Sequence, residues 1–133
     1  MLFFNKGKQF ADIDTASYSV MLSLSVHQRY FIYRSPADMR KGFDGLSGLV
    51  SDHLKQNPLS GDVFVFLNKR RNQIKLLCWE GDGFMLFSKR LEKGTFELPE
   101  GNELKINVDV LSCILQGIKL SSMHKRKRYI HAA

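Results

Sequence analysis

The stretch from residue 62 to residue 91 constrains the fold more than any other part of the chain. It holds three runs rich in aromatic and branched aliphatic residues, at 62–67, 73–79 and 84–91. The links between these runs are short, and they are polar or contain glycine. This pattern is typical of an antiparallel meander, so it predicts three consecutive strands joined by short turns.

Both faces of the predicted sheet are partly apolar. Alternation along the second run places Ile74, Leu76 and Cys78 on one face. Leu77 and Trp79 then lie on the opposite face, and the third run alternates in the same way. A sheet that is apolar on two sides needs a cover on each. We therefore expect helices on one face and another segment, or a partner protein, on the second.

A strand and a long helix are predicted upstream of the meander. Residues 28–34 are expected to join the sheet as a fourth strand. Ser35 and Pro36 are typical of a helix start, because serine suits the N-cap and proline fits the first turn. An apolar stripe at helical spacing then predicts a helix over about 36–56 that packs on the sheet. Three glycines between 42 and 48 indicate close packing of helix against sheet or, alternatively, a frayed helix start.

A second helix is predicted near the C-terminus, at about 107–117. Asn107 is its expected N-cap, and Gly117 is well placed to end it. Residues 95–98 are a candidate for one more short strand. The predicted fold class is therefore α+β, with a small antiparallel sheet of four to five strands packed by the two helices.

The chain is predicted to form a single domain over 21–118, flanked by two terminal segments. Residues 1–20 lack a coherent pattern, and Met21 is an alternative start. We therefore expect residues 1–20 to be an appendage that is either disordered or covers the open sheet face. Residues 119–133 hold five basic and no acidic residues, against a net charge of +7 for the whole chain. Such a tail is a candidate phosphate-binding arm, or else it only aids solubility.

The sequence argues against an enzyme and against a membrane protein. It contains no phosphate-cradling glycine loop, no nucleophile elbow and no histidine pair at metal-ligand spacing. The acidic residues that could converge on a metal are better explained as caps and turn formers. We therefore predict no catalytic residue, no metal site and no cofactor. No apolar run could span a bilayer, and Cys78 and Cys113 are expected to be buried thiols, so a cytoplasmic location is predicted.

Basic residues give the strongest functional indication. They gather at the start of the first predicted helix, at the tip between the first two meander strands, after the third strand, and in the tail. If these groups share one side, they form a surface that follows a nucleic-acid backbone; otherwise they are ordinary solvated charge. The candidate nucleic-acid-binding residues are Arg40, Lys41, Lys69, Arg70, Arg71, Lys89, Arg90, Lys93, Lys125, Arg126, Lys127 and Arg128.

A second candidate surface is apolar. Because the sheet has two apolar faces, an exposed patch on one of them could contact another protein. The candidate protein-interaction residues are Leu77, Trp79, Met85 and Phe87.

Four motifs within residues 30–99 resemble a known family. They begin with Asp38-Met-Arg-Lys-Gly-Phe-Asp-Gly-Leu and Ser60-Gly-Asp-Val-Phe-Val-Phe-Leu-Asn-Lys-Arg, and continue with Ile74-Lys-Leu-Leu-Cys-Trp-Glu-Gly-Asp-Gly-Phe and Phe87-Ser-Lys-Arg-Leu-Glu-Lys-Gly-Thr-Phe. Together and in this order they resemble the TnpB-type accessory proteins of the IS66 class of bacterial insertion sequences, which are distinct from the RNA-guided nuclease of the same name.

The resemblance implies a small, non-catalytic protein that assists DNA transposition beside a separate transposase. Its expected partners are DNA, the transposase and a second element-encoded accessory protein. The alternative is a protein-interaction module or regulator that makes no direct contact with DNA. The family supplies no established catalytic or ligand residue to carry over, and its members often have a second tryptophan where this chain has Cys78.

Overall fold

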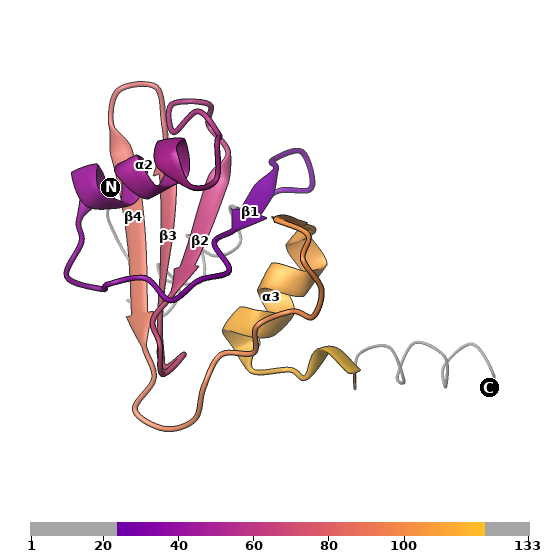
Figure 1. Cartoon of the computed structure of the whole chain (residues 1–133). Helices are drawn as coiled ribbons and strands as arrows, with labels where there is room; N and C mark the ends of the chain where they lie inside the picture. The colour runs from indigo at the N-terminus through magenta and orange to yellow at the C-terminus, as the bar shows by residue number, and fades with distance from the viewer. Residues whose placement is uncertain (1–23, 122–133) are drawn as a thin grey trace, which may run out of the picture.

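The computed structural model describes residues 24–121, which form a five-stranded sheet with one helix on each face (Figure 1). The N-terminal appendage predicted at 1–20 and the basic tail residues 125–128 lie outside the described residues. Within residues 24–121, no helix has the length and apolar character needed to cross a membrane. In chain order the elements are β1 (Tyr30–Ile32), α2 (Phe43–Asp52), β2 (Val63–Leu67), β3 (Gln73–Trp79), β4 (Phe84–Arg90), β5 (Lys105–Ile106) and α3 (Val108–Gln116).

The predicted meander is confirmed as β2, β3 and β4, and the α+β class is confirmed with it. The strand order is β4-β3-β2-β1-β5, and β3 pairs antiparallel with both of its neighbours. The sheet is mixed, however, because β1 pairs parallel with β2. The chain leaves β1, crosses one face as α2 and enters β2 in the same direction, which is the connection that a parallel pair requires.

Helix α2 begins at Phe43, so the helix start predicted at Pro36 is wrong. The segment after β1 continues alongside β2 instead: Tyr33 donates its backbone N–H to the Val65 carbonyl and Ala37 to the Leu67 carbonyl, both at 2.9 Å. These long-range hydrogen bonds satisfy the backbone groups that a helix would have used, and they override the local signal of serine and proline.

The frayed start is also the better explanation of the glycines near α2. Gly42 is the N-cap, and it offers no side chain to cap the helix. A Cβ added at Gly48 would meet no other atom within 4 Å, whereas one at Gly45 would meet only the Lys41 side chain among its nearest contacts. Close packing of these glycines on the sheet is therefore not what the structure shows.

Helix α3 forms where the sequence predicted it. The Asn107 side chain accepts a hydrogen bond from the Val110 N–H at 2.8 Å, and Gly117 ends the helix in the left-handed conformation, with φ 75°. The fifth strand lies at β5 and not at 95–98, which is irregular. Phe96 is nevertheless buried, because it inserts into the core beneath α3.

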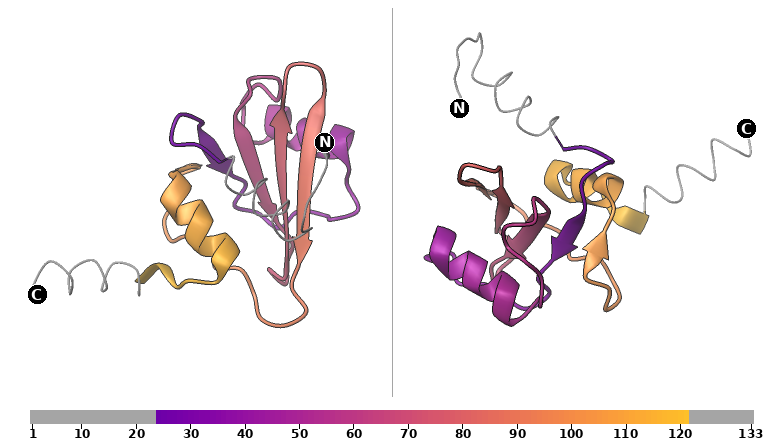
Figure 2. Two further views of the ribbon diagram at one scale, coloured as in Figure 1. Left: turned by 180° about the vertical axis from the view of Figure 1, so that it is seen from behind. Right: turned by 90° about the horizontal axis from the view of Figure 1, so that it is seen from above.

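The two apolar faces of the sheet are each covered by one helix, as Figure 2 shows from above. The predicted alternation is confirmed, since even-numbered and odd-numbered positions of β3 belong to different clusters. The cluster under α2 contains Phe31, Leu46, Val50, Leu54, Phe64, Phe66 and Leu77. The cluster under α3 contains Tyr30, Ile32, Val63, Val65, Leu67, Ile74, Leu76, Cys78, Phe96, Leu111, Ile114 and Leu115.

Both cysteines are buried, as expected. The Cys78 thiol lies within 3.5 Å of the Gly61 carbonyl oxygen, to which it can donate. Burial raises the pKa of this thiol, and the nearby Glu80 carboxylate raises it further. Because the thiolate is the reactive form, Cys78 is a packing residue at neutral pH.

Candidate nucleic-acid interface

Most of the predicted basic residues lie at one end of the sheet, where β2 turns into β3. Lys69, Arg70 and Arg71 form that turn. The end of β4 lies beside it, since Arg90 pairs with Gln73 and the Leu91 N–H donates to the Asn72 carbonyl at 2.7 Å. The loop that follows carries Lys93 and returns to the same turn, where the Phe96 N–H donates to the Arg71 carbonyl at 2.6 Å.

The connection from β1 to α2 brings Arg40 and Lys41 to this end as well. In Figure 1 it crosses the sheet below α2. Lys75, in the first half of β3, fixes it there: its ammonium group donates to the carbonyls of Met39 at 2.8 Å and Lys41 at 3.0 Å. We call the resulting surface the basic end, defined by Arg40, Lys41, Lys69, Arg70, Arg71, Lys89, Arg90 and Lys93.

The charges of the basic end are not equally available. Arg40 pairs with Asp38 at 2.8 Å, and this pair holds the pKa of the Asp38 carboxyl well below its usual range. Arg90 approaches Glu92 at 3.8 Å, and the Lys89 ammonium donates to the Leu115 carbonyl at the end of α3.

The β2–β3 turn carries the least compensated charge. Among residues 24–121, no carboxylate lies within ion-pair distance of Lys69, Arg70 or Arg71, and all three are exposed. A cation without a carboxylate partner keeps its full charge for a ligand, so this turn is the most electropositive part of the basic end.

Two asparagines that the sequence analysis did not single out hold this turn in shape. The Asn68 amide donates to the Asn72 side-chain oxygen at 2.7 Å, and its own oxygen accepts from the Gln73 N–H at 3.1 Å. Arg71 adopts a left-handed backbone conformation, with φ 59°. Asparagine on both sides of a basic tip is a recognisable turn signal, and it fixes the direction in which the basic side chains leave the turn.

The predicted apolar interaction patch does not form, because the sheet separates its members. Leu77 is fully buried under α2. Met85 and Phe87 pack on the opposite face, since Met85 pairs with Cys78 and belongs to the cluster under α3. Trp79 lies at the far end of β3, away from the basic end.

Trp79 belongs instead to a different group, which we call the aromatic cluster: Phe43, Trp79 and Phe84. The Trp79 and Phe84 rings meet edge-on at 5.0 Å between centroids, and Phe84 stacks with Phe43 at 6.4 Å. Phe43 is 46% exposed, which is unusual for a phenylalanine at the start of a helix that covers the sheet. The aromatic cluster therefore offers apolar surface at the end of the sheet opposite the basic end.

Comparison with known proteins places the chain in a family. A family model described as IS66 Orf2 like protein matches residues 28–125. The chain belongs to this family. The match confirms the IS66-class accessory protein that the four motifs indicated. It covers every helix and strand from β1 to α3.

Curated relatives of this IS66 Orf2-like protein come from Sinorhizobium fredii (strain NBRC 101917 / NGR234). The uncharacterized protein y4hO is 39% identical over 100 residues, which cover 74% of this chain and 87% of the relative. The uncharacterized protein y4jC is 33% identical over 109 residues, covering 80% of this chain and 92% of the relative. No solved structure matches the chain significantly.

In this IS66 Orf2-like protein, the acidic residues between 24 and 121 do not gather into a metal site. Within residues 24–121, no three histidine, cysteine, aspartate or glutamate side chains lie close enough to hold a metal ion. Asp62 has a structural role instead: it accepts two hydrogen bonds from the Arg29 guanidinium, at 3.0 and 2.7 Å, and one from the Ser60 hydroxyl at 2.9 Å. These bonds tie the beginning of β1 to the beginning of β2.

Proposed function

We propose that this insertion-sequence accessory protein assists transposition by binding DNA through the basic end, while a separate transposase carries out the chemistry. The observation that carries the proposal is the convergence of basic segments that are far apart in sequence. Residues 40–41, 69–71, 89–90 and 93 reach one end of the sheet through long-range hydrogen bonds and strand register.

Phosphate contact is the interaction that this geometry favours. Exposed lysine and arginine side chains release condensed counterions when they neutralise DNA phosphates, so binding falls steeply as salt concentration rises. Base-specific readout needs side chains held against base edges in a groove, and none of the helices among residues 24–121 projects from the basic end in this way. Binding is therefore expected to follow the DNA backbone with little sequence preference.

The Lys69→Ala/Arg70→Ala double variant tests the proposal. Both residues are exposed and make no ion pair within the described chain, so the fold should tolerate their loss. Fluorescence anisotropy with a duplex at several salt concentrations gives the slope of log affinity against log salt. Loss of two phosphate contacts should reduce that slope by about 2.

A Lys55→Gly/Lys105→Ala double variant is the matched control. It removes the same charge from exposed positions outside the basic end, since Lys55 follows α2 and Lys105 lies on the edge strand β5. Its slope should stay close to that of the unaltered protein. Equal slopes for the two double variants, or no binding by the unaltered protein at low salt, would contradict the proposal.

A second candidate function is docking onto the transposase or another element-encoded protein. The exposure of Phe43 and its stacking on Phe84 favour it, because aromatic residues often dominate the energy of protein interfaces. We expect the complex to survive high salt and nuclease treatment, and Trp79→Ala to weaken it by about 30-fold or more, which corresponds to a hot spot of about 2 kcal/mol.

Co-purification with the transposase after nuclease treatment measures this effect. Leu59→Ala is the control, because Leu59 is also an exposed apolar side chain, at 51%, but lies outside the aromatic cluster. Phe43→Ala should act in the same direction as Trp79→Ala without disturbing the core. A complex that both aromatic variants leave intact would dispose of the docking function.

A further inference from the structure

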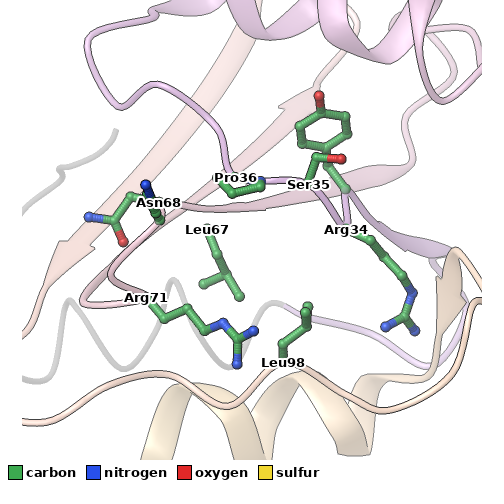
Figure 3. A pocket seen from close by; sticks show the side chains of 9 residues that line it. Arg34, Ser35, Pro36, Leu67, Asn68, Arg71 and Leu98 are labelled. Atoms are coloured by element: carbon green, nitrogen blue, oxygen red, sulfur yellow. The ribbon is translucent and has the colours of Figure 1, made fainter.

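A small pocket opens at the basic end, between the segment that follows β1 and the turn that follows β2 (Figure 3). Its volume of about 80 Å³ exceeds the roughly 30 Å³ that one water molecule occupies in the liquid, so it suits a group of a few heavy atoms. It is lined by Tyr33, Arg34, Ser35, Pro36, Leu67, Asn68, Lys69, Arg71 and Leu98.

The lining of this pocket has the character of an anion site. Three of the nine residues, Arg34, Lys69 and Arg71, are cationic, and none of the nine is acidic. Leu67 and Leu98 form an apolar surface between the charges, as Figure 3 shows. Charges beside apolar, partly enclosed surface are screened less by water than charges on an open surface, so they attract an anion more strongly.

The hydrogen bonds around the pocket set the positions of its cations. The Arg34 guanidinium donates to the backbone carbonyls of Pro99 and Glu103, which fixes it without neutralising it. The Arg71 guanidinium has no carboxylate partner among residues 24–121, and Figure 3 shows it reaching beneath Leu67 toward Leu98. Arg34 therefore lines the pocket with its guanidinium engaged by backbone carbonyls, whereas Arg71 and Lys69 keep unused side-chain donors.

The backbone of Arg71 adopts a conformation that glycine would adopt more readily. A residue with a side chain pays about 1 kcal/mol to adopt the left-handed conformation that glycine adopts freely, and a hairpin turn of this kind commonly has glycine there. Two backbone hydrogen bonds hold this conformation. The Arg71 N–H donates to the Asn68 carbonyl, and the Arg71 carbonyl accepts from the Phe96 N–H. Of the two non-glycine residues among 24–121 with this conformation, Arg71 and Lys55, only Arg71 lines the pocket.

We propose that this pocket binds one phosphate group, and that in the DNA complex the group is either a phosphate of the backbone or the terminal phosphate of a strand. The proposal deepens the proposed function, on which its DNA part rests. The guanidinium of Arg71 donates in the fork geometry that matches phosphate oxygens, while Lys69 and the Ser35 hydroxyl supply further donors.

Arg71→Gly is the decisive variant, because glycine relieves the backbone strain while it removes the cation. Lys55→Gly is its matched control, because Lys55 is also a cationic residue in the left-handed conformation, with φ 56°, but does not line the pocket. Both variants should keep or raise the thermal unfolding midpoint of the full chain. Inorganic phosphate, compared with chloride at the same ionic strength, should raise that midpoint by a few degrees for the unaltered protein and Lys55→Gly, and not for Arg71→Gly.

Duplexes with a 5′-phosphate and a 5′-hydroxyl distinguish the two sources of the phosphate. A terminal phosphate in the pocket should make the unaltered protein bind the phosphorylated duplex about fivefold more tightly, and Arg71→Gly should abolish the difference. A backbone phosphate should give equal binding to both duplexes, weakened equally by Arg71→Gly. If phosphate stabilises Arg71→Gly and the unaltered protein equally, or stabilises neither, the pocket is not a phosphate site. If the unaltered protein still binds DNA with a steep salt dependence in that case, the proposed function stands without the pocket.

Discussion

Replacing Phe64 with alanine is expected to lower the free energy of unfolding by about 3–5 kcal/mol. Phe64 lies on β2 in the interior of the sheet, it is completely buried under α2, and its ring stacks on Phe31 at 5.8 Å between centroids. Truncation removes the apolar surface and leaves a cavity that the paired strands cannot close. A loss of this size is a large part of the 5–15 kcal/mol that holds a typical domain folded.

Urea unfolding followed by circular dichroism measures the loss, with Phe43→Ala as the control. Phe43 contributes to the same face of the molecule, but it is 46% exposed and lies at the start of α2. The same truncation there should cost less than about 1 kcal/mol. If the two variants were equally destabilised, the assignment of Phe64 to the core and of Phe43 to the surface would be wrong.

Replacing Phe96 with alanine is expected to cost about as much, roughly 3–5 kcal/mol, although Phe96 belongs to no helix or strand. The side chain is 1% exposed and fills the core between the sheet and α3. Its loss should also loosen α3, so amide hydrogen exchange should become faster in α3 than in α2.

Phe96→Leu is the comparison variant for this position. Leucine keeps most of the apolar volume, so it should recover the larger part of the stability that alanine loses. The backbone N–H of residue 96 still donates to the Arg71 carbonyl in both variants, which separates the packing of the ring from the hydrogen bond. An alanine variant as stable as the leucine variant would show that Phe96 is not a core residue.

The sequence alone determined the elements whose signals are local. Alternation of apolar residues identified β2, β3 and β4 and assigned the β3 residues to their faces, because side chains along a strand point alternately to its two sides. Asn107 and Gly117 marked α3, because a cap and a left-handed end each involve only neighbouring residues. The family was readable from four contiguous motifs in the same way.

Only the tertiary structure decided the features that depend on partners distant in sequence. The chain from Tyr33 to Ala37 lies along β2 because its N–H groups find carbonyls there, although its local signal favours a helix. Strand register likewise separated Met85 from Trp79 and brought Arg90 beside the β2–β3 turn. The pocket joins residues 33–36, 67–69, 71 and 98, and no local pattern could unite them, because the hydrogen bonds that close such contacts form only when the sheet is assembled.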